Sequence, residues 1–233
     1  MNKEEIRKST LKKRLALSSR EIKDKSHQIF LNLIKTKEFL NSKNIMFYVA
    51  TRSEVQTEKM IEVSIKMGKK VFVPIILTDG IDLAPSRLID FDRELEKGKK
   101  GILEPKKEYQ RLFPPKNIDL IILPGIAFDL AGNRIGRGLG YYDNFLKKVS
   151  PSTKLTSLAF EMQIVKKVPN DSNDIPVDKI ITEKRIINSI EYRVYIEENR
   201  SQEPESRSQN KNESKLKSKK ITKSLLDTRY GIL

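Results

Sequence analysis

The segment from Arg134 to Asp143 combines side chains and bare backbone that could hold phosphate groups. Three glycines alternate with other residues from Gly136 to Gly140, and without Cβ atoms their N–H groups can approach a ligand closely. Arg134 and Arg137 add fixed positive charges whose fork geometry suits phosphate or carboxylate. Asp143 closes the segment with a carboxylate that could hold a magnesium ion against those phosphates. The segment therefore predicts a loop that binds a nucleoside triphosphate.

This loop differs from the two best-known nucleotide-binding loops. The chain contains no Gly-x-x-x-x-Gly-Lys-Ser/Thr sequence, and Tyr141 stands where the dinucleotide-binding fingerprint needs its third glycine. A Gly-x-Gly-x-Gly run alone is as often a flexible turn as a binding loop. Two arginines, the pair Tyr141 and Tyr142, and Asp143 favour the binding loop, because a plain turn needs none of them.

Alternating strands and helices are expected to position this loop. Residues 118–123 form a short apolar run, rich in β-branched side chains and closed by Pro124 and Gly125, which indicates a buried strand. Residues 141–149 have helical spacing, so the glycines should lead into the start of a helix. By the same patterns we expect strands at 44–50, 71–74, 81–84, 154–160 and 179–182. We expect helices at 3–17, 18–35 and 57–68. Ser18 and Thr57 are expected to cap the second and third of these helices.

The order of these elements predicts an α/β fold with a mostly parallel sheet flanked by helices. Residues 1–196 should form a single compact domain, with an irregular stretch at 88–115. Residues 197–233 should form a disordered polar tail, because 197–220 holds one leucine and too little apolar surface to fold. Ligands of such sheets gather at the carboxyl ends of strands, so Glu54, the glycine loop and Asp174 should converge there.

The composition agrees with a cytoplasmic protein that has one good core. Hydrophobic residues make up 37% of the 233 residues, and no apolar run approaches the ~20 residues of a membrane span. The charged N-terminus has no apolar signal-peptide region, so we expect a cytoplasmic location and no membrane partner. Cysteine is absent, which excludes disulfides, thiol catalysis and cysteine-bound metals. The single histidine, His27, cannot form a multi-histidine zinc site.

The net charge of +15 raises the question of a nucleic-acid partner. The lysines are scattered through every predicted element, and Asp and Glu are interleaved with them, so no single basic face is indicated. Positive charge also attracts small polyanions such as ATP. We therefore expect no nucleic-acid partner.

The glycine loop and its flanks resemble the hallmark of the 5-formyltetrahydrofolate cyclo-ligases, a family also called 5,10-methenyltetrahydrofolate synthetases. The resemblance spans roughly residues 2 to 190, and Leu139 departs from it by standing where the family often has glycine or lysine. Three other segments resemble the family in order and spacing: Lys3 to Arg7, Ser53 to Thr57, and Val168 to Asp178. The hallmark itself runs Pro124-Gly125-Ile-Ala-Phe128-Asp129-Leu-Ala-Gly132-Asn-Arg134-Ile-Gly136-Arg137-Gly138-Leu-Gly140-Tyr141-Tyr142-Asp143.

The resemblance implies conversion of 5-formyltetrahydrofolate, with or without a polyglutamate chain, to 5,10-methenyltetrahydrofolate by a monomer that uses ATP and magnesium and releases ADP and phosphate. It implies that Arg134 and Arg137 are catalytic and that Asp143 and Asp174 hold magnesium. The implied nucleotide site comprises Lys3, Arg7, Arg134, Ile135, Gly136, Arg137, Gly138, Leu139, Gly140, Tyr141 and Tyr142. The implied folate site comprises Val49, Glu54, Arg137, Gly138, Leu139, Gly140 and Tyr141.

Two other functions stay open on the sequence. An α/β enzyme could bind phosphates at strand ends without ATP, as sugar-phosphate isomerases and CoA transferases do. Such an enzyme has no need of a metal-binding aspartate at the position of Asp143. A basic, catalytically silent nucleic-acid-binding module would instead use the lysines and the tail.

Overall fold

The structure is a computed structural model that describes residues 1–77, 82–98, 102–171 and 173–200. The chain divides into two compact units, residues 1–193 and residues 194–233. The sheet and the pocket described below belong to the first unit. Among the described residues, every helix is too short or too polar to cross a lipid bilayer.

A seven-stranded sheet forms the centre of the first unit, with strand order β11-β10-β9-β6-β1-β2-β3 in the described residues. The inner strands are parallel to one another, whereas the edge strands β3 and β11 pair antiparallel with their neighbours. The prediction of an α/β fold with a mostly parallel sheet is therefore confirmed. The strands are β1 (Asn44–Phe47), β2 (Lys70–Ile76), β3 (Leu83–Leu88), β6 (Leu120–Leu123), β9 (Lys154–Leu158), β10 (Lys179–Ile181) and β11 (Ile186–Asn188).

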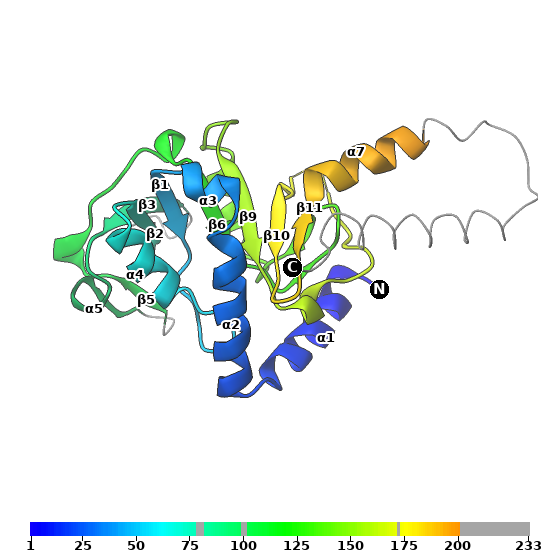
Figure 1. The fold of residues 1–233 in the computed structure, drawn as a ribbon, viewed down its shortest axis with the longest axis horizontal. Helices are drawn as coiled ribbons and strands as arrows, with labels where there is room; N and C mark the ends of the chain where they lie inside the picture. The colour runs from blue at the N-terminus through cyan, green and yellow to red at the C-terminus, as the bar shows by residue number, and fades with distance from the viewer. Residues whose placement is uncertain (78–81, 99–101, 172, 201–233) are drawn as a thin grey trace, which may run out of the picture. The chain divides into compact units, whose positions relative to one another are not determined.

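Both faces of the sheet are covered by apolar side chains, as parallel sheets require. Every residue of β6 is fully buried, which explains its unbroken apolar sequence. Phe47 of β1 faces a cluster to which α2 (Ser19–Leu33), α3 (Lys37–Asn41) and α4 (Glu58–Lys66) contribute. Met46, its neighbour, faces the opposite cluster, to which α6 (Tyr141–Leu146) contributes. Figure 1 shows α2, α3 and α4 on the same side of the strands.

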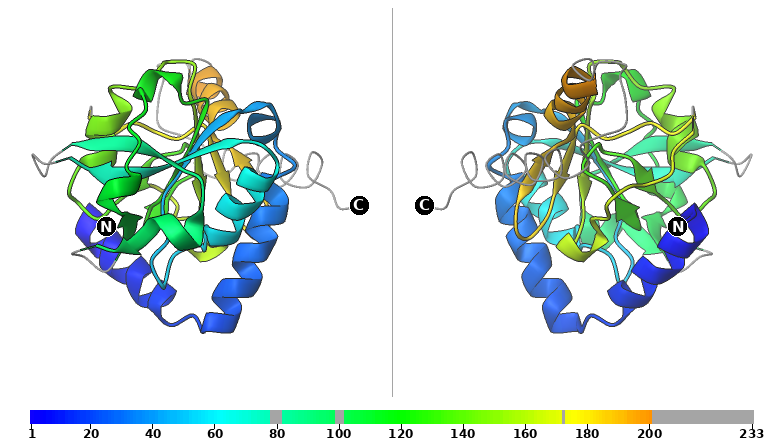
Figure 2. Two further views of the ribbon diagram at one scale, coloured as in Figure 1. Left: turned by 90° about the vertical axis from the view of Figure 1, so that its left-hand side faces the viewer. Right: turned by 90° about the vertical axis from the view of Figure 1, so that its right-hand side faces the viewer.

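The first two helices begin at strong N-terminal caps. Asn2 and Ser18 each accept a hydrogen bond from the third helical residue, whose glutamate side chain reaches back to the cap, so both caps are complete capping boxes. The cap predicted at Ser18 is thus confirmed. α1 (Lys3–Leu15) and α2 meet at a short connection and diverge from it (Figure 2). α1 packs against the single turn η3 (Glu161–Gln163) and the short strand β7 (Ala127–Phe128).

The cap predicted at Thr57 is right in position and wrong in chemistry. Thr57 precedes α4, but its hydroxyl makes no capping hydrogen bond. The hydroxyl donates to the carbonyl of Tyr48 at 2.8 Å and accepts from the N–H of Ala50 at 3.2 Å. Thr57 therefore ties the start of α4 to the chain that leaves β1.

Several short elements were not predicted, because runs of two to five residues carry no measurable period. The stretch 88–115, expected to be irregular, is organised around Asp90, which caps α5, and around the ion pair of Glu94 with Arg111 at 3.0 Å. The unpredicted short elements are α3, α5 (Phe91–Glu94), β4 (Leu95–Lys97), β5 (Leu103–Pro105), η1 (Lys107–Tyr109), η2 (Pro115–Asn117), β7, β8 (Arg134–Ile135), η3 and β11. The longer helix α7 (Ser189–Arg200) was also not predicted.

Some predicted boundaries also differ from the structure. β1 ends at Phe47 instead of residue 50, and α6 ends at Leu146 instead of residue 149. The domain boundary predicted after residue 196 falls inside α7, which continues to Arg200. The rest of the predicted tail lies outside the described residues, so the expected disorder of 201–233 stays a prediction. The pair Asp79 and Gly80, whose sequence predicts a turn, also lies outside them.

Candidate active site

The pocket of the first unit lies where the sheet topology predicts a ligand. β1 and β6 are adjacent and parallel, but the chain continues from β1 towards β2 and from β6 towards β9, on opposite sides. The carboxyl ends of two such strands diverge and leave a crevice between them. Tyr48 and Val49 leave β1 into this crevice, and Pro124 and Gly125 leave β6 into it. The pocket has a volume of about 400 Å³.

A small hairpin of β7 and β8 carries Arg134 into the pocket. The buried carboxylate of Asp129 closes the hairpin turn by accepting from the N–H of Asn133 at 3.0 Å and from the N–H of Val168 at 2.9 Å. Arg134 is therefore a strand residue on a braced hairpin, not part of a free loop as its sequence context suggested. Its guanidinium is almost fully buried and donates to Asp143 at 2.6 Å.

The glycines after this hairpin form a backbone cradle. Gly138 has a φ of +88° and Gly140 a φ of +68°, conformations that strain any other residue. A Cβ atom added at Gly136 or Gly140 would meet no atom within 4 Å, so the backbone there is open. The carbonyl of Gly136 accepts from Nε of Arg7 at 3.1 Å, which ties the cradle to α1.

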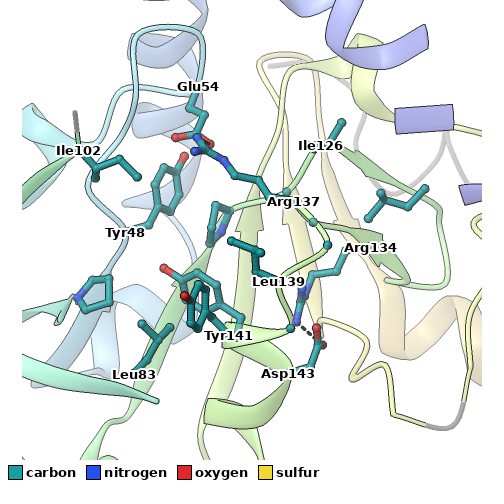
Figure 3. A pocket seen from close by; sticks show the side chains of 18 of the residues that line it. Tyr48, Glu54, Leu83, Ile102, Ile126, Arg134, Arg137, Leu139, Tyr141 and Asp143 are labelled. Carbon is teal, nitrogen blue, oxygen red and sulfur yellow. Dashed lines mark hydrogen bonds and ion pairs between the residues drawn. The ribbon is translucent and has the colours of Figure 1, made fainter. Parts of the chain in front are cut away.

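Each of three cations at the pocket is paired with a carboxylate that also lines it. Arg134 pairs with Asp143 at 2.6 Å, Arg137 with Glu54 at 3.1 Å, and Lys3 with Asp174 at 2.6 Å. Figure 3 shows Arg134 beside Asp143, and Arg137 reaching towards Glu54. In total, four cations and four carboxylates line the described pocket: Lys3, Arg7, Arg134 and Arg137, with Glu54, Glu104, Asp143 and Asp174.

Glu54 is held in one orientation by hydrogen bonds to both of its carboxylate oxygens. Oε2 accepts from the N–H of Thr51 at 2.8 Å, and Oε1 accepts from Arg137 at 3.1 Å. Burial, followed by the nearby charge of Glu54, raises the pKa of the phenols of Tyr48 and Tyr142 well above the usual range. Both phenols therefore stay neutral, and that of Tyr48 donates to the carbonyl of Val55 at 2.9 Å.

An apolar wall completes the pocket. Leu83, Ile102 and Leu103 line it together with Ile76. In Figure 3, Leu83, Ile102 and Tyr48 stand across the pocket from Arg134 and Asp143. The pocket therefore has a charged side and an apolar side.

The carboxylates of the pocket suit a magnesium ion that the protein binds only in part, with phosphates of a bound nucleotide and water supplying the other oxygen atoms. The described residues contain no group of three His, Cys, Asp or Glu side chains that could hold a metal by themselves. Magnesium, however, commonly takes one or two carboxylates and completes its shell with substrate phosphates and water. Asp143 and Asp174 line the same pocket and supply such carboxylates.

Comparison with known proteins decides what kind of protein carries this pocket. The family model of the 5-formyltetrahydrofolate cyclo-ligases matches residues 1–183. The chain belongs to that family. It is 35% identical to the mouse 5-formyltetrahydrofolate cyclo-ligase over 187 residues, which is 76% of this chain and 91% of the mouse protein. A probable 5-formyltetrahydrofolate cyclo-ligase of Caenorhabditis elegans is 34% identical over 181 residues, 73% of this chain and 87% of that protein.

Solved structures of the family agree with the fold. A 5,10-methenyltetrahydrofolate synthetase from Aquifex aeolicus matches with a TM-score of 0.71 at 30% identity, covering 91% of this chain and all of that one. One from Mycoplasma pneumoniae matches with a TM-score of 0.63 at 23% identity, over 78% of this chain and 99% of that chain, and supports the fold alone.

The pocket of this cyclo-ligase family member brings together every residue that the sequence assigned to the site. The ligand roles of these residues remain predictions. They are Lys3, Arg7, Val49, Glu54, Arg134, Ile135, Gly136, Arg137, Gly138, Leu139, Gly140, Tyr141, Tyr142, Asp143 and Asp174.

Sequence reasoning missed Arg14, which lies behind the pocket wall. Arg14 is 3% exposed and donates to the carbonyl of Gly125 at 3.2 Å, while its Nε has no partner among the described residues. Burial lowers the pKa of its guanidinium, and the charge of Glu54 opposes that shift. A signal was present in the sequence, because Arg14 follows Ile6 and Thr10 at four-residue steps on the buried face of α1.

Proposed function

We propose that this pocket converts 5-formyltetrahydrofolate to 5,10-methenyltetrahydrofolate, using magnesium and ATP and releasing ADP and phosphate. Of the three functions that the sequence left open, this is the one that family membership supports. The observation that carries the proposal is that one pocket contains a cationic glycine cradle, an apolar wall and the carboxylate of Glu54, which Thr51 and Arg137 orient.

The cradle provides the contacts that a triphosphate needs. Arg134 and Arg137 bring guanidinium groups, which bind phosphate oxygens in a bidentate manner. Lys3 and Arg7 reach the same pocket from α1. The bare backbone from Gly136 to Gly140 lets N–H groups approach the phosphates without obstruction.

The opposite side suits the folate ring. The aminopyrimidine edge of the pterin carries adjacent N–H donors, which match the two oxygens of the Glu54 carboxylate. Glu54 is already oriented by Thr51 and Arg137, so little ordering is needed when the substrate binds. Leu83 and Ile102 offer apolar surface to the faces of the ring.

Such a site carries out its chemistry by positioning and charge neutralisation. The formyl oxygen is a poor leaving group until it receives the γ-phosphate of ATP. N10 of the folate then attacks the formyl carbon and loses its proton, and the carbon–oxygen bond breaks with release of phosphate. Arg134 and Arg137 would neutralise charge on the transferring phosphoryl group, so no covalent nucleophile is required. Asp143 and Asp174 would hold a magnesium ion, which would offset negative charge on the phosphates.

The test is a spectroscopic assay of methenyltetrahydrofolate formation from 5-formyltetrahydrofolate. We expect its absorbance to appear with magnesium and ATP together, and to be absent without ATP or in excess chelator. Equal turnover in chelator would overturn the metal assignment, and absence of turnover with the complete mixture would overturn the proposed function.

We also propose that the enzyme works in the cytoplasm as a monomer. The fifteen residues that the sequence assigned to the site all line one pocket of a single chain, which supports a site that is complete within one chain. Light scattering of the active enzyme should give the mass of one chain. A dimer mass at assay concentrations would contradict this.

A further inference from the structure

Of the four carboxylates that line the described pocket, Glu104 is the one that no cation holds. Glu54 accepts a hydrogen bond from Arg137 at 3.1 Å, and Asp143 and Asp174 each accept one from a basic side chain at 2.6 Å. The side chain of Glu104 makes neither a hydrogen bond nor an ion pair with the described residues, and the proposed function gives it no role. Both of its carboxylate oxygens are therefore available to a ligand.

The hairpin of β4 and β5 fixes where this carboxylate lies. Glu104 follows Leu103 of the apolar wall on β5, and the N–H of Gly98 closes the hairpin by donating to the carbonyl of Ile102 at 2.8 Å. A Cβ atom added at Gly98 would lie 2.6 Å from the carboxyl carbon of Glu104. The carboxyl group thus rests against the bare backbone of Gly98, in space that a larger residue would fill. Glu96, its partner across the hairpin, is exposed and does not line the pocket.

The proposed reaction releases a proton, and the described pocket offers a single unengaged acceptor for it. N10 of the folate carries a hydrogen atom before ring closure and none afterwards. Apart from the carboxylates, the titratable side chains of the pocket are lysine, arginine and tyrosine, which carry their own protons near neutral pH. Three of the four carboxylates are held by cations, so Glu104 is the group that remains.

The expected position of the substrate brings N10 to the side of the pocket where Glu104 lies. With the aminopyrimidine edge at Glu54 and the triphosphate at the glycine cradle, the formyl oxygen must face the cradle. N10 joins the pterin to the aminobenzoyl ring, a flat apolar group that suits the wall of Leu83, Ile102 and Leu103. Figure 3 shows Leu83 and Ile102 across the pocket from the charged side. N10 therefore lies between the cradle and the wall that continues into Glu104.

We propose that Glu104 is a catalytic residue, the general base that accepts the N10 proton during ring closure. This inference rests on the proposed function and adds a proton acceptor to it. The lone pair of N10 forms the bond to the formyl carbon, and the N10–H bond breaks as its proton passes to the Glu104 carboxylate. The carbon–oxygen bond then breaks, and its electron pair leaves with the phosphate. Glu104 finally releases the proton to water.

The first test is Glu104→Gln, which keeps the shape of the side chain and removes its ability to take up the proton. Its kcat should fall by about 10²-fold, the lower range for general-base catalysis. The dissociation constants of 5-formyltetrahydrofolate and of ATP should stay within about twofold, because the role belongs to a later step. Glu96→Gln is the matched control, since it removes the same charge from the facing position of the same hairpin, and its kcat should not change. Gly98→Ala should also lower kcat, because the added methyl group displaces the carboxylate.

Oxygen exchange within isotopically labelled ATP separates a base from a merely structural role. Phosphoryl transfer to the formyl oxygen precedes ring closure, and its reversal moves the label between the bridging and non-bridging oxygens of the β-phosphate. Glu104→Gln should keep this exchange at least as fast as in the unaltered chain, while methenyltetrahydrofolate forms slowly. Exchange that falls together with turnover, or that is absent in the variant, would overturn the inference.

Two further outcomes separate this inference from the proposed function. An unchanged kcat in Glu104→Gln would show that water takes the proton, which would overturn the role of Glu104 and leave the proposed reaction standing. An unaltered chain that shows no turnover with 5-formyltetrahydrofolate, magnesium and ATP would overturn the proposed function itself, and the inference with it. Melting temperatures of all three variants confirm that the comparison is made between folded proteins.

Discussion

At the scale of single residues, Arg137 links the two halves of the proposed reaction site. It donates to Glu54 at 3.1 Å and to the hydroxyl of Thr51 at 3.2 Å, and its side chain is 51% exposed. Arg137→Ala should lower kcat by about 10²-fold, because a phosphate-clamping charge acts most strongly in the transition state. The melting temperature should hardly change, since the side chain is half exposed. Steady-state kinetics together with thermal melting check both parts, and normal kinetics in a folded variant would contradict the role.

Replacing Glu54 should weaken folate binding while leaving nucleotide binding nearly unchanged. Glu54→Gln replaces a carboxylate that can accept two N–H donors with an amide that presents one oxygen. Folate binding should weaken by on the order of 1–3 kcal/mol, as for a charge-assisted hydrogen bond in a partly buried site. Binding of the magnesium–ATP complex should stay nearly intact. Titration with each ligand separately is the measurement, and equal weakening of both would instead indicate a folding defect.

At the scale of secondary-structure elements, most elements long enough to show a period were predicted from the sequence, whereas the short ones and α7 were missed. β6 was found because its apolar run matches a strand buried on both faces. The hairpin of β7 and β8 has two residues in each strand, and Asp129, which holds it together, acts through long-range contacts to Val168. Arg134 therefore lies in the expected pocket but on a strand instead of a loop, and its role stays a prediction.

α1 should influence the pocket through Arg14. The lining charges of the described pocket cancel, whereas Arg14 is buried behind the wall without an ion pair among the described residues. Its charge should therefore favour anionic ligands. Arg14→Met should raise the KM values for ATP and folate by about threefold to tenfold, a weak coulombic effect at several ångströms. Arg14→Lys, which keeps the charge, should restore most of the loss. Unchanged KM values in the methionine variant would contradict this.

The ion pair between Glu38 of α3 and Lys179 of β10 should make the stability of the fold depend on pH in the acid range. Burial works to raise the pKa of the Glu38 carboxyl. The hydrogen bond from Lys179, a backbone hydrogen bond and the charges of Lys179 and Lys154 together outweigh it, so the pKa is lower than its ordinary value of 4.5. Because the folded pKa is depressed, this stabilisation is complete above the ordinary value and is lost as the pH falls through the folded one.

Glu38→Gln lacks this pH-dependent stabilisation. The unaltered chain should therefore exceed the variant in unfolding free energy at pH 7, and the difference should shrink as the pH falls below about 4.5. Urea unfolding of both proteins at neutral and acid pH measures it. A difference that grows in acid would show that the pKa shift has the opposite sign.

At the scale of the whole molecule, the lining of the described pocket lies between Lys3 and Asp174, and the last strand of the sheet ends at Asn188. A chain that ends after Arg200 should therefore keep its melting temperature and its turnover. Calorimetry and the absorbance assay on the shortened and full chains test this. Precipitation or lost activity of the shortened chain would mean that residues 201–233 contribute to the core or the site.

Which charged residues line the pocket was easier to predict from the sequence than their ion pairs or the apolar wall. Lys3, Glu54 and Asp174 lie far apart in the sequence, yet all three follow from segments with family-like spacing, and the pocket contains them all. The ion pair of Lys3 with Asp174 and that of Glu54 with Arg137 depend on three-dimensional proximity alone. Ile102 and Leu103 come from a stretch without periodic pattern, so the apolar wall on that side was not foreseeable.

The positions of the tyrosines make intrinsic fluorescence a signal for ligand binding in the pocket. The chain has no tryptophan and seven tyrosines, so its intrinsic ultraviolet fluorescence comes from phenol side chains. Tyr48, Tyr141 and Tyr142 line the pocket. Burial raises the pKa of the phenols of Tyr48 and Tyr142 above its ordinary value of 10.0, so both stay protonated and keep their emission in alkaline solution as well. Occupation of the pocket can thus be followed from the light that the unlabelled protein emits.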